Sequence, residues 1–152
     1  MQPLPHTRSC FVCGESNPFG LRLRFTTDGR LAHTRFRPRP EHIGFRHTIH
    51  GGILGTVLDE IMVWACAIAT GRFAYCAELT VRFSRPTPPD EELLVTAELV
   101  TNRRDRIYEA RGEVKNAAGT LIASATGKYV PLPESDVPIM LADLIGQWPP
   151  PK

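Results

Sequence analysis

Apolar and polar residues alternate along four segments in the second half of the chain. The alternation has a period of two, which is typical of a β-strand with one buried face. The segments cover residues 75–83, 93–99, 108–114 and 121–129. The connections between them, at 85–90, 101–106 and 116–119, are too short to hold crossover helices. The pattern therefore predicts four consecutive strands in an antiparallel meander.

Two further elements precede these strands. Alternation over residues 21–25, a turn pair Asp-Gly at 28–29 and an apolar-polar run at 31–36 predict a hairpin. Residues 51–70 are apolar on almost every side and end before Gly71, which is typical of a buried helix. The simplest assembly is an α+β fold, in which a curved antiparallel sheet wraps around a central α-helix in the order β-β-α-β-β-β-β.

Length, composition and charge limit the class of protein. The 152 residues, 42% of them apolar, suit one domain over 1–152, with a core at about 17–130. The proline-rich tail at 131–152 is expected to be extended, with a short helical turn around 136–145. A formal net charge of +2 gives no electrostatic reason to expect nucleic acid or a membrane as a partner.

The chain shows no targeting pattern and no long apolar span. Its longest apolar run, at 61–69, is shorter than a bilayer requires, and the N-terminus lacks the pattern of a signal peptide. The four cysteines are then better interpreted as thiols than as disulfides. These features together predict a cytoplasmic protein.

An acidic pair, Asp59-Glu60, lies within the apolar helix. Burial without partners is costly for a carboxylate and raises its pKa toward the range useful to a general base. The alternative is an acid that faces solvent or pairs with an arginine. One helical step of about 100° separates the two residues, so they cannot point the same way.

The helix opens with His50-Gly51-Gly52. Free backbone N–H groups and the helix dipole make this start a candidate oxyanion site, and an ordinary loop-to-helix turn is the alternative. Asp59 lies about 10 Å beyond Gly52 along an ideal helix, so one helix cannot bring both to a single carbonyl carbon. Two antiparallel copies across a twofold interface can, which predicts a homodimer with shared sites. A monomer in which Asp59 works alone also fits the sequence.

These residues resemble a known family. The segment HGGILGTVLDE, preceded by CFVCGESNPFGLRLRF and followed by YCAELTVRFSRPTPPDEELLVTAELV, is similar to the hotdog-fold acyl-CoA thioesterases, in particular their PaaI-like branch. The most specific part is His-Gly-Gly with an acid nine positions after the histidine, which is Asp59. The similarity runs from about Cys10 to Val130 and implies the hotdog fold.

The resemblance implies hydrolysis of an acyl-CoA thioester to a carboxylic acid and free CoA, by a homodimer or homotetramer with sites between subunits. By position, Asp59 is the catalytic carboxylate, acting as base or nucleophile. Gly51 or Gly52 donates the N–H that polarises the carbonyl, and His50 shapes the loop. Many members carry a glutamine or asparagine six residues before the histidine, where this chain has Gly44. Nearby polar candidates for that role are His42, His47 and Asn17.

Arginines and cysteines supply the remaining candidate sites. Guanidinium groups suit the phosphates of CoA, and the alternative is ordinary surface charge. The candidates are Arg82, Arg85, Arg103 and Arg104. The pair Cys10-x-x-Cys13 resembles half a zinc knuckle, which only a His47-x-x-His50 pair is spaced to complete. We therefore expect buried thiols there, with no metal and no cofactor.

Other functions fit parts of the pattern. A hotdog hydratase or dehydratase carries a different Asp/His pattern, which this chain lacks. A non-catalytic acyl-CoA binding module on the same fold is the main alternative, because the amide is missing at position 44. Glu60 is expected to pair with a basic residue or to face the rim of the site. The sequence is compatible with CoA or acyl-carrier protein as the thiol carrier.

Overall fold

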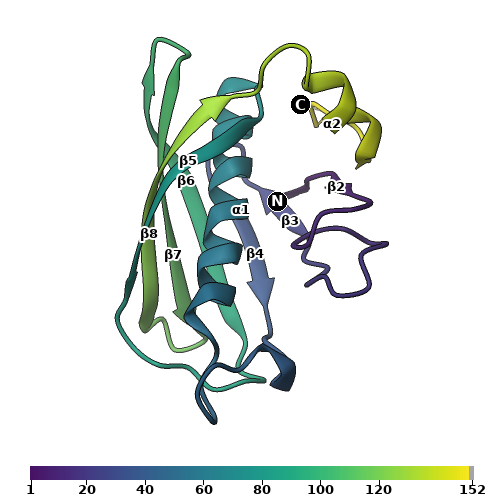
Figure 1. Ribbon diagram of the computed structural model, residues 1–152. Coiled ribbons are helices and arrows are strands. Elements are labelled where there is room, and N and C mark those ends of the chain that lie inside the picture. The colour runs from purple at the N-terminus through teal and green to yellow at the C-terminus, as the bar shows by residue number, and fades with distance from the viewer. Residues whose placement is uncertain (151–152) are drawn as a thin grey trace.

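One long helix packs against a large antiparallel sheet in the computed structural model, which describes residues 1–150 (Figure 1). The helix, α1, spans Gly51–Thr70, and the sheet has seven strands. Its principal strands are β3 (Phe25–Thr27), β4 (Ala32–Phe36), β5 (Ala74–Phe83), β6 (Leu93–Arg103), β7 (Ile107–Asn116) and β8 (Leu121–Pro131). The order β3-β4-α1-β5-β6-β7-β8 confirms the α+β class and the order of elements expected from the sequence.

Helix α1 has a defined start and end. The Gly52 N–H donates a 2.8 Å hydrogen bond to Nδ1 of His50, which caps the first turn. The helix ends at Gly71, which adopts a left-handed φ of 74°. Leu58 and Ile61 are fully buried in the core beneath the sheet. By length and composition α1 is apolar enough to cross a membrane, yet more than half of its most apolar stretch is buried here, as in a core helix.

The order of strands in the sheet corrects the predicted meander. Strands β6, β7 and β8 are consecutive neighbours, but β5 pairs with β8 and not with β6. The proline-rich segment 84–92 carries the chain past the ends of β7 and β8 to the start of β6 (Figure 1). That crossing covers three strand spacings, about 14 Å. An extended segment of this length spans it without a helix.

Strand β5 lies at the edge of the sheet. The alternation predicted a half-buried strand, but Tyr75, Leu79 and Phe83 are 56%, 36% and 54% exposed. Within residues 1–150 the strand has β8 on one side and no partner on the other. Alternation identifies the residues that share a face but not what covers that face, so the pattern alone could not reveal the exposed edge.

The predicted hairpin forms but is shorter than expected. Regular pairing begins at Phe25, because Arg22 adopts a left-handed φ of 56° that interrupts the extended chain. The turn follows the predicted Asp-Gly pair: Oδ1 of Asp28 accepts hydrogen bonds from the N–H groups of Arg30 and Leu31.

The two ends of the chain pair with each other. Strand β1 (Gln2–Pro3) extends the sheet beside β3, and β2 (His6–Thr7) pairs with β9 (Leu144–Ile145). Helix α2 (Val137–Asp143) confirms the helical turn expected in the tail. Trp148 then packs on Trp64 of α1, with ring centroids 5.8 Å apart. The ends therefore form a layer beside α1, opposite β7 and β8 (Figure 1).

Candidate active site

Asp59 meets Tyr129 of strand β8. The Tyr129 hydroxyl donates a hydrogen bond to Oδ1 of Asp59 at 3.0 Å and lies 3.3 Å from the Asp59 carbonyl oxygen. Tyr129 is fully buried, and this burial together with the Asp59 carboxylate raises the pKa of its phenol. The phenol therefore keeps its proton and orients the carboxylate. Asp59 itself is partly exposed.

The role of Tyr129 was not predicted from the sequence, although a signal for it exists at Gly127. A Cβ at position 127 would lie 2.6 Å from the Tyr129 ring. Gly127 and Tyr129 are two residues apart and so share a strand face, where the glycine makes room for the ring. A glycine inside a strand often marks such a close approach.

Cys76 of strand β5 lies beside the same carboxylate. Its register partner across the sheet is Tyr129. Burial and the nearby Asp59 carboxylate raise the pKa of the Cys76 thiol to about 11. The thiol is therefore neutral near pH 7, which makes it a poor nucleophile.

The start of α1 offers one free backbone donor. Of the two glycines left open by the sequence, Gly52 uses its N–H to bind Nδ1 of His50. The Gly51 N–H makes no hydrogen bond within residues 1–150. Gly51 also packs tightly on Phe83, since a Cβ at position 51 would lie 3.0 Å from Cζ of that ring. Of the two glycines, Gly51 therefore keeps the unbound N–H, and His50 caps the helix.

A cavity of about 600 Å³ adjoins this helix start. It is formed by the loop before α1 and by the segment that follows β5, and Gly51, Phe83 and Arg85 are among its lining residues. Arg85 is the only cationic side chain among the lining residues within 1–150. The cavity thus combines an apolar wall, a free N–H and one positive charge.

Position 44, where relatives were expected to carry an amide, lies on the wall of this cavity. A Cβ at Gly44 would lie 3.0 Å from Cδ2 of His50, so the imidazole occupies the place where a side chain would begin. None of the three substitutes considered from the sequence lines the cavity. His42 is buried with Nδ1 bound to the Arg39 N–H, His47 is exposed, and the Asn17 side chain binds the Ser9 carbonyl.

The four candidate arginines do not form one patch within a chain. Arg82 and Arg85 lie at the end of β5 where Phe83 pairs with Ala123. Arg103 and Arg104 lie at the β6–β7 turn, at the opposite end of the sheet. All four are exposed, and Arg103 forms an ion pair with Glu109 at 2.7 Å. This corrects the expectation of a single phosphate site, because spacing along the sequence does not show at which end of the sheet a turn lies.

Glu60 occupies a different environment from the one expected. It forms none of the ion pairs found among residues 1–150. Instead, both carboxylate oxygens lie 3.8 Å from Sγ of Cys10. Burial, followed by the charge of Cys10, raises the pKa of Glu60 to about 8. The expected basic partner is therefore wrong, because residues of the distant N-terminal segment cover this side of α1.

Comparison with known proteins identifies the family. Residues 47–123, about half of the chain, match the family model of the thioesterase superfamily. The chain belongs to the thioesterase superfamily. This confirms the family that the HGG motif and its downstream acid indicated. No protein in a search of curated sequences matches the chain.

Solved structures share the fold of this thioesterase superfamily member. A protein described as a thioesterase superfamily protein has a TM-score of 0.72 at 25% identity; the match covers 81% of this chain but 63% of the other, less than two thirds of its length. A mutant of the phenylacetic acid degradation protein PaaI from Thermus thermophilus has a TM-score of 0.65 at 25% identity, covering 74% of this chain and 95% of that one. A Streptococcus mutans protein bound to acetyl CoA has a TM-score of 0.67 at 17% identity, covering 72% and 88%.

These matches confirm the hotdog fold and the resemblance to the PaaI-like branch. Within the thioesterase superfamily match lie the helix start and Asp59, and also Arg82 and Arg85. Tyr129 and the turn at Cys10 lie outside the matched residues. The group that orients Asp59 and the groups around Glu60 therefore come from parts of the chain that the family model does not cover.

Proposed function

We propose that this protein hydrolyses an acyl-CoA thioester to a carboxylic acid and free CoA. The observation that carries the proposal is the Asp59 carboxylate, which is partly exposed and held by the protonated phenol of Tyr129 on the central helix of a thioesterase superfamily fold. A carboxylate held in this way can take a proton from water as the water oxygen bonds to the thioester carbon. The carbon–sulfur bond then breaks, and the thiolate of CoA takes up the proton.

The same carboxylate can also act as the nucleophile. In that case an Asp59 oxygen bonds to the acyl carbon, CoA leaves, and water hydrolyses the resulting anhydride. In both cases negative charge develops on the carbonyl oxygen. The free N–H of Gly51, at the positive end of α1, is suited to stabilise that charge.

The reaction requires Gly51 and Asp59 to meet at one carbonyl group, and one chain keeps them apart. They are eight positions apart in helix α1, which is about 12 Å along the axis. We propose a homodimer in which the Asp59 of one chain faces the Gly51 of its partner. The unpaired edge of β5, with its exposed aromatic side chains, supports this arrangement, because a long free edge is a ready site for pairing with a second copy.

The cavity at the helix start supports CoA as part of the substrate. Its apolar wall suits the acyl chain or the pantetheine arm, and Arg85 supplies a guanidinium for a phosphate. Arg82 is exposed near the end of strand β5, just before the residues of that strand end that line the cavity. The acetyl CoA carried by the Streptococcus mutans relative is consistent with this chemistry on the same fold.

The glycine at position 44 favours a second candidate function, a non-catalytic acyl-CoA binding module. The amide expected to hold the reactive water or acid is absent, and the His50 ring fills its place. Such a module would bind acyl-CoA in the cavity without consuming it.

Thiol release from short, long and aromatic acyl-CoAs tests the proposal, with the wild type beside Asp59→Asn. We expect turnover of at least one acyl class, and a loss of about 100-fold or more in the variant, which corresponds to ~2.7 kcal/mol of transition-state stabilisation. No turnover by the wild type, together with a higher Tm in the presence of acyl-CoA, would support the binding module instead.

A further inference from the structure

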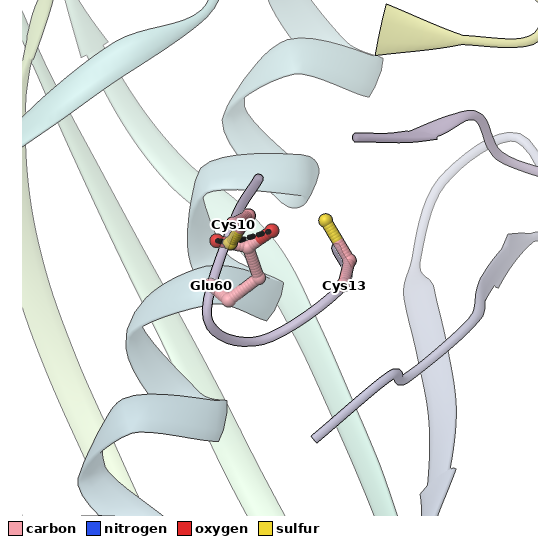
Figure 2. A group of neighbouring side chains, drawn as sticks. All are labelled: Cys10, Cys13 and Glu60. Carbon is pink, nitrogen blue, oxygen red and sulfur yellow. Dashed lines mark hydrogen bonds between the residues drawn. The ribbon is translucent and has the colours of Figure 1, made fainter. Parts of the chain in front are cut away.

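Three side chains with ligand atoms for a metal ion meet on the side of α1 that faces the N-terminal segment of the chain, away from Tyr129. Sγ of Cys10, Sγ of Cys13 and a carboxylate oxygen of Glu60 all lie within 4.8 Å of one another. Figure 2 shows the two cysteines on one turn of the N-terminal segment, with Glu60 extending from the helix to Cys10. Fifty positions of chain separate Glu60 from Cys10, so only folding brings them together.

The turn that holds the cysteines is fixed by its backbone. The Val12 N–H donates to Sγ of Cys10 at 3.2 Å, and the Gly14 N–H donates to the Cys10 carbonyl at 2.8 Å. A Cβ at Gly14 would lie 2.2 Å from that carbonyl oxygen, so the turn requires glycine there. An N–H aimed at sulfur stabilises a thiolate, which is the form that binds a metal. The loop is thus shaped to present its two sulfurs to a cation.

Glu60 has no other partner that explains its position. Both of its oxygens face Cys10 at 3.8 Å, and no ion pair among residues 1–150 includes it. A thiol is a weak hydrogen-bond donor and compensates a carboxyl group poorly. A divalent cation between these groups would satisfy the carboxylate and both sulfurs at once.

We propose that Cys10, Cys13 and Glu60 bind a zinc ion. Two thiolates and a carboxylate suit zinc, since thiolate ligands disfavour magnesium and calcium, and an iron–sulfur cluster commonly takes four cysteines. Tetrahedral zinc places two sulfur ligands about 3.7 Å apart, so the side chains need to move little from the separations found here. A small cavity of about 180 Å³, which Cys10 and Glu60 help to line, adjoins the cluster and has room for a water as the fourth ligand.

Zinc in this place would tie the N-terminal segment to the middle of α1. It would act on a different side of the helix from the Asp59 carboxylate and would take no part in thioester chemistry. The expected consequence is a structural one: loss of the ion releases a crosslink between positions 10 and 60 and lowers the Tm.

The test is metal analysis of the full-length protein, purified in the presence of a reductant and without a histidine tag. We expect about one zinc per chain, and, after chelation, one cobalt with a thiolate-to-cobalt charge-transfer band in the near ultraviolet. Cobalt affinity should fall by more than about 100-fold in Cys13→Ser and in Glu60→Gln, since even changes outside the ligand shell cost about 10- to 100-fold.

Two matched variants serve as controls. Asp59→Asn makes the same acid-to-amide change one residue away, and Cys76→Ser removes a thiol outside the cluster; both should keep the metal and the cobalt band. Absence of zinc and of a cobalt band in the reduced wild type would overturn the proposal, as would a Cys10–Cys13 disulfide in the protein as purified that, once reduced, gives thiols which bind no cobalt. Equal metal binding by Glu60→Gln would also contradict it. None of these readouts depends on thioesterase activity.

Discussion

Asp59 and Glu60 are neighbours in the chain, yet they lie in two different regions of the molecule. The Asp59 carboxylate meets a buried phenol and a neutral thiol from strands β8 and β5. The Glu60 carboxylate meets two cysteines from the N-terminal segment. One helical step of about 100° is enough to direct the two carboxylates into different environments.

The difference shows how a single helix can carry two kinds of acid. On the sheet side, a phenol with a firmly held proton donates a hydrogen bond to the Asp59 carboxylate and orients it. On the N-terminal side, desolvation raises the pKa of Glu60 to about 8, which disfavours a bare charge there. The environment of Asp59 suits a base or nucleophile, and the environment of Glu60 suits a metal ligand.

The same acid-to-amide change at Asp59 and at Glu60 tests the difference between the two carboxylates with the largest expected effect. Asp59→Asn should lower kcat/KM by about 100-fold or more, and Glu60→Gln by less than about tenfold, because we propose that only the first carboxylate acts on the thioester. Steady-state thiol release on one acyl-CoA measures both. An equal loss at the two positions would show that the two sides of α1 do not differ in the way described.

Removal of the phenol tests what holds Asp59 on the sheet side. Tyr129→Phe deletes the hydroxyl that donates to Oδ1 at 3.0 Å and should reduce kcat about tenfold, the cost of one charge-assisted hydrogen bond. The binding of a non-hydrolysable acyl-CoA analogue serves as the control and should change little. A variant with wild-type kcat would mean that Asp59 is oriented by another group.

Gly127 provides an independent route to the same tyrosine. An alanine there would place Cβ 2.6 Å from the Tyr129 ring, so the ring must shift and the core becomes overpacked. We expect Gly127→Ala to destabilise the fold by ~1–3 kcal/mol, measured by denaturant unfolding, and to lower kcat as well. Unchanged stability would show that the ring has free room.

The smallest effect concerns the titration of Cys76. Its pKa of about 11 should fall in Asp59→Asn, since the carboxylate contributes to the rise after burial. The folded thiol keeps its proton above pH 9, where the unfolded one releases it, so stability falls as pH rises from about 9 to about 11, less steeply in the variant. The ¹³Cβ shift of labelled Cys76 reports the pKa. Titration near 9 in the wild type would remove Cys76 from the Asp59 cluster.

Local patterns were sufficient to predict the elements of the fold. Helix α1 ends at the predicted Gly71, and Asp28 turns the chain as expected, because caps and turns depend on a few adjacent residues. The position of β5 beside β8 was not predictable in this way. Strand alternation contains no information about which neighbour a strand selects when a long loop follows it.

The candidate site shows the same difference between local patterns, which the sequence reveals, and long-range contacts, which it does not. Asp59 and the Gly51-Gly52 pair were proposed as site residues from one short motif, since all three belong to α1 and its start. The partners of the two acids were not, because Tyr129 comes from β8 and the cysteines come from the N-terminal segment. Glu60 was assigned a basic partner on general grounds, and only the packing of distant segments shows that thiols surround it.

The central claim is that one active site takes Asp59 from one chain and the Gly51 N–H from another. Complementation tests it most directly, with Asp59→Asn and Gly51→Pro, each inactive alone, co-expressed to form mixed dimers. Proline is tolerated in the first turn of a helix and His50 already has an extended ψ of 129°, so the change removes the N–H and adds a ring beside Phe83. Gly51→Ala keeps the N–H beside the same Phe83 ring and should lose much less activity.

Mixed dimers should regain activity, because one of their two sites then combines an intact Asp59 with an intact Gly51. Recovery of about half of the wild-type kcat per purified mixed dimer is the predicted result. Mixed dimers as inactive as either parent would contradict the shared site and place both groups of each site on a single chain.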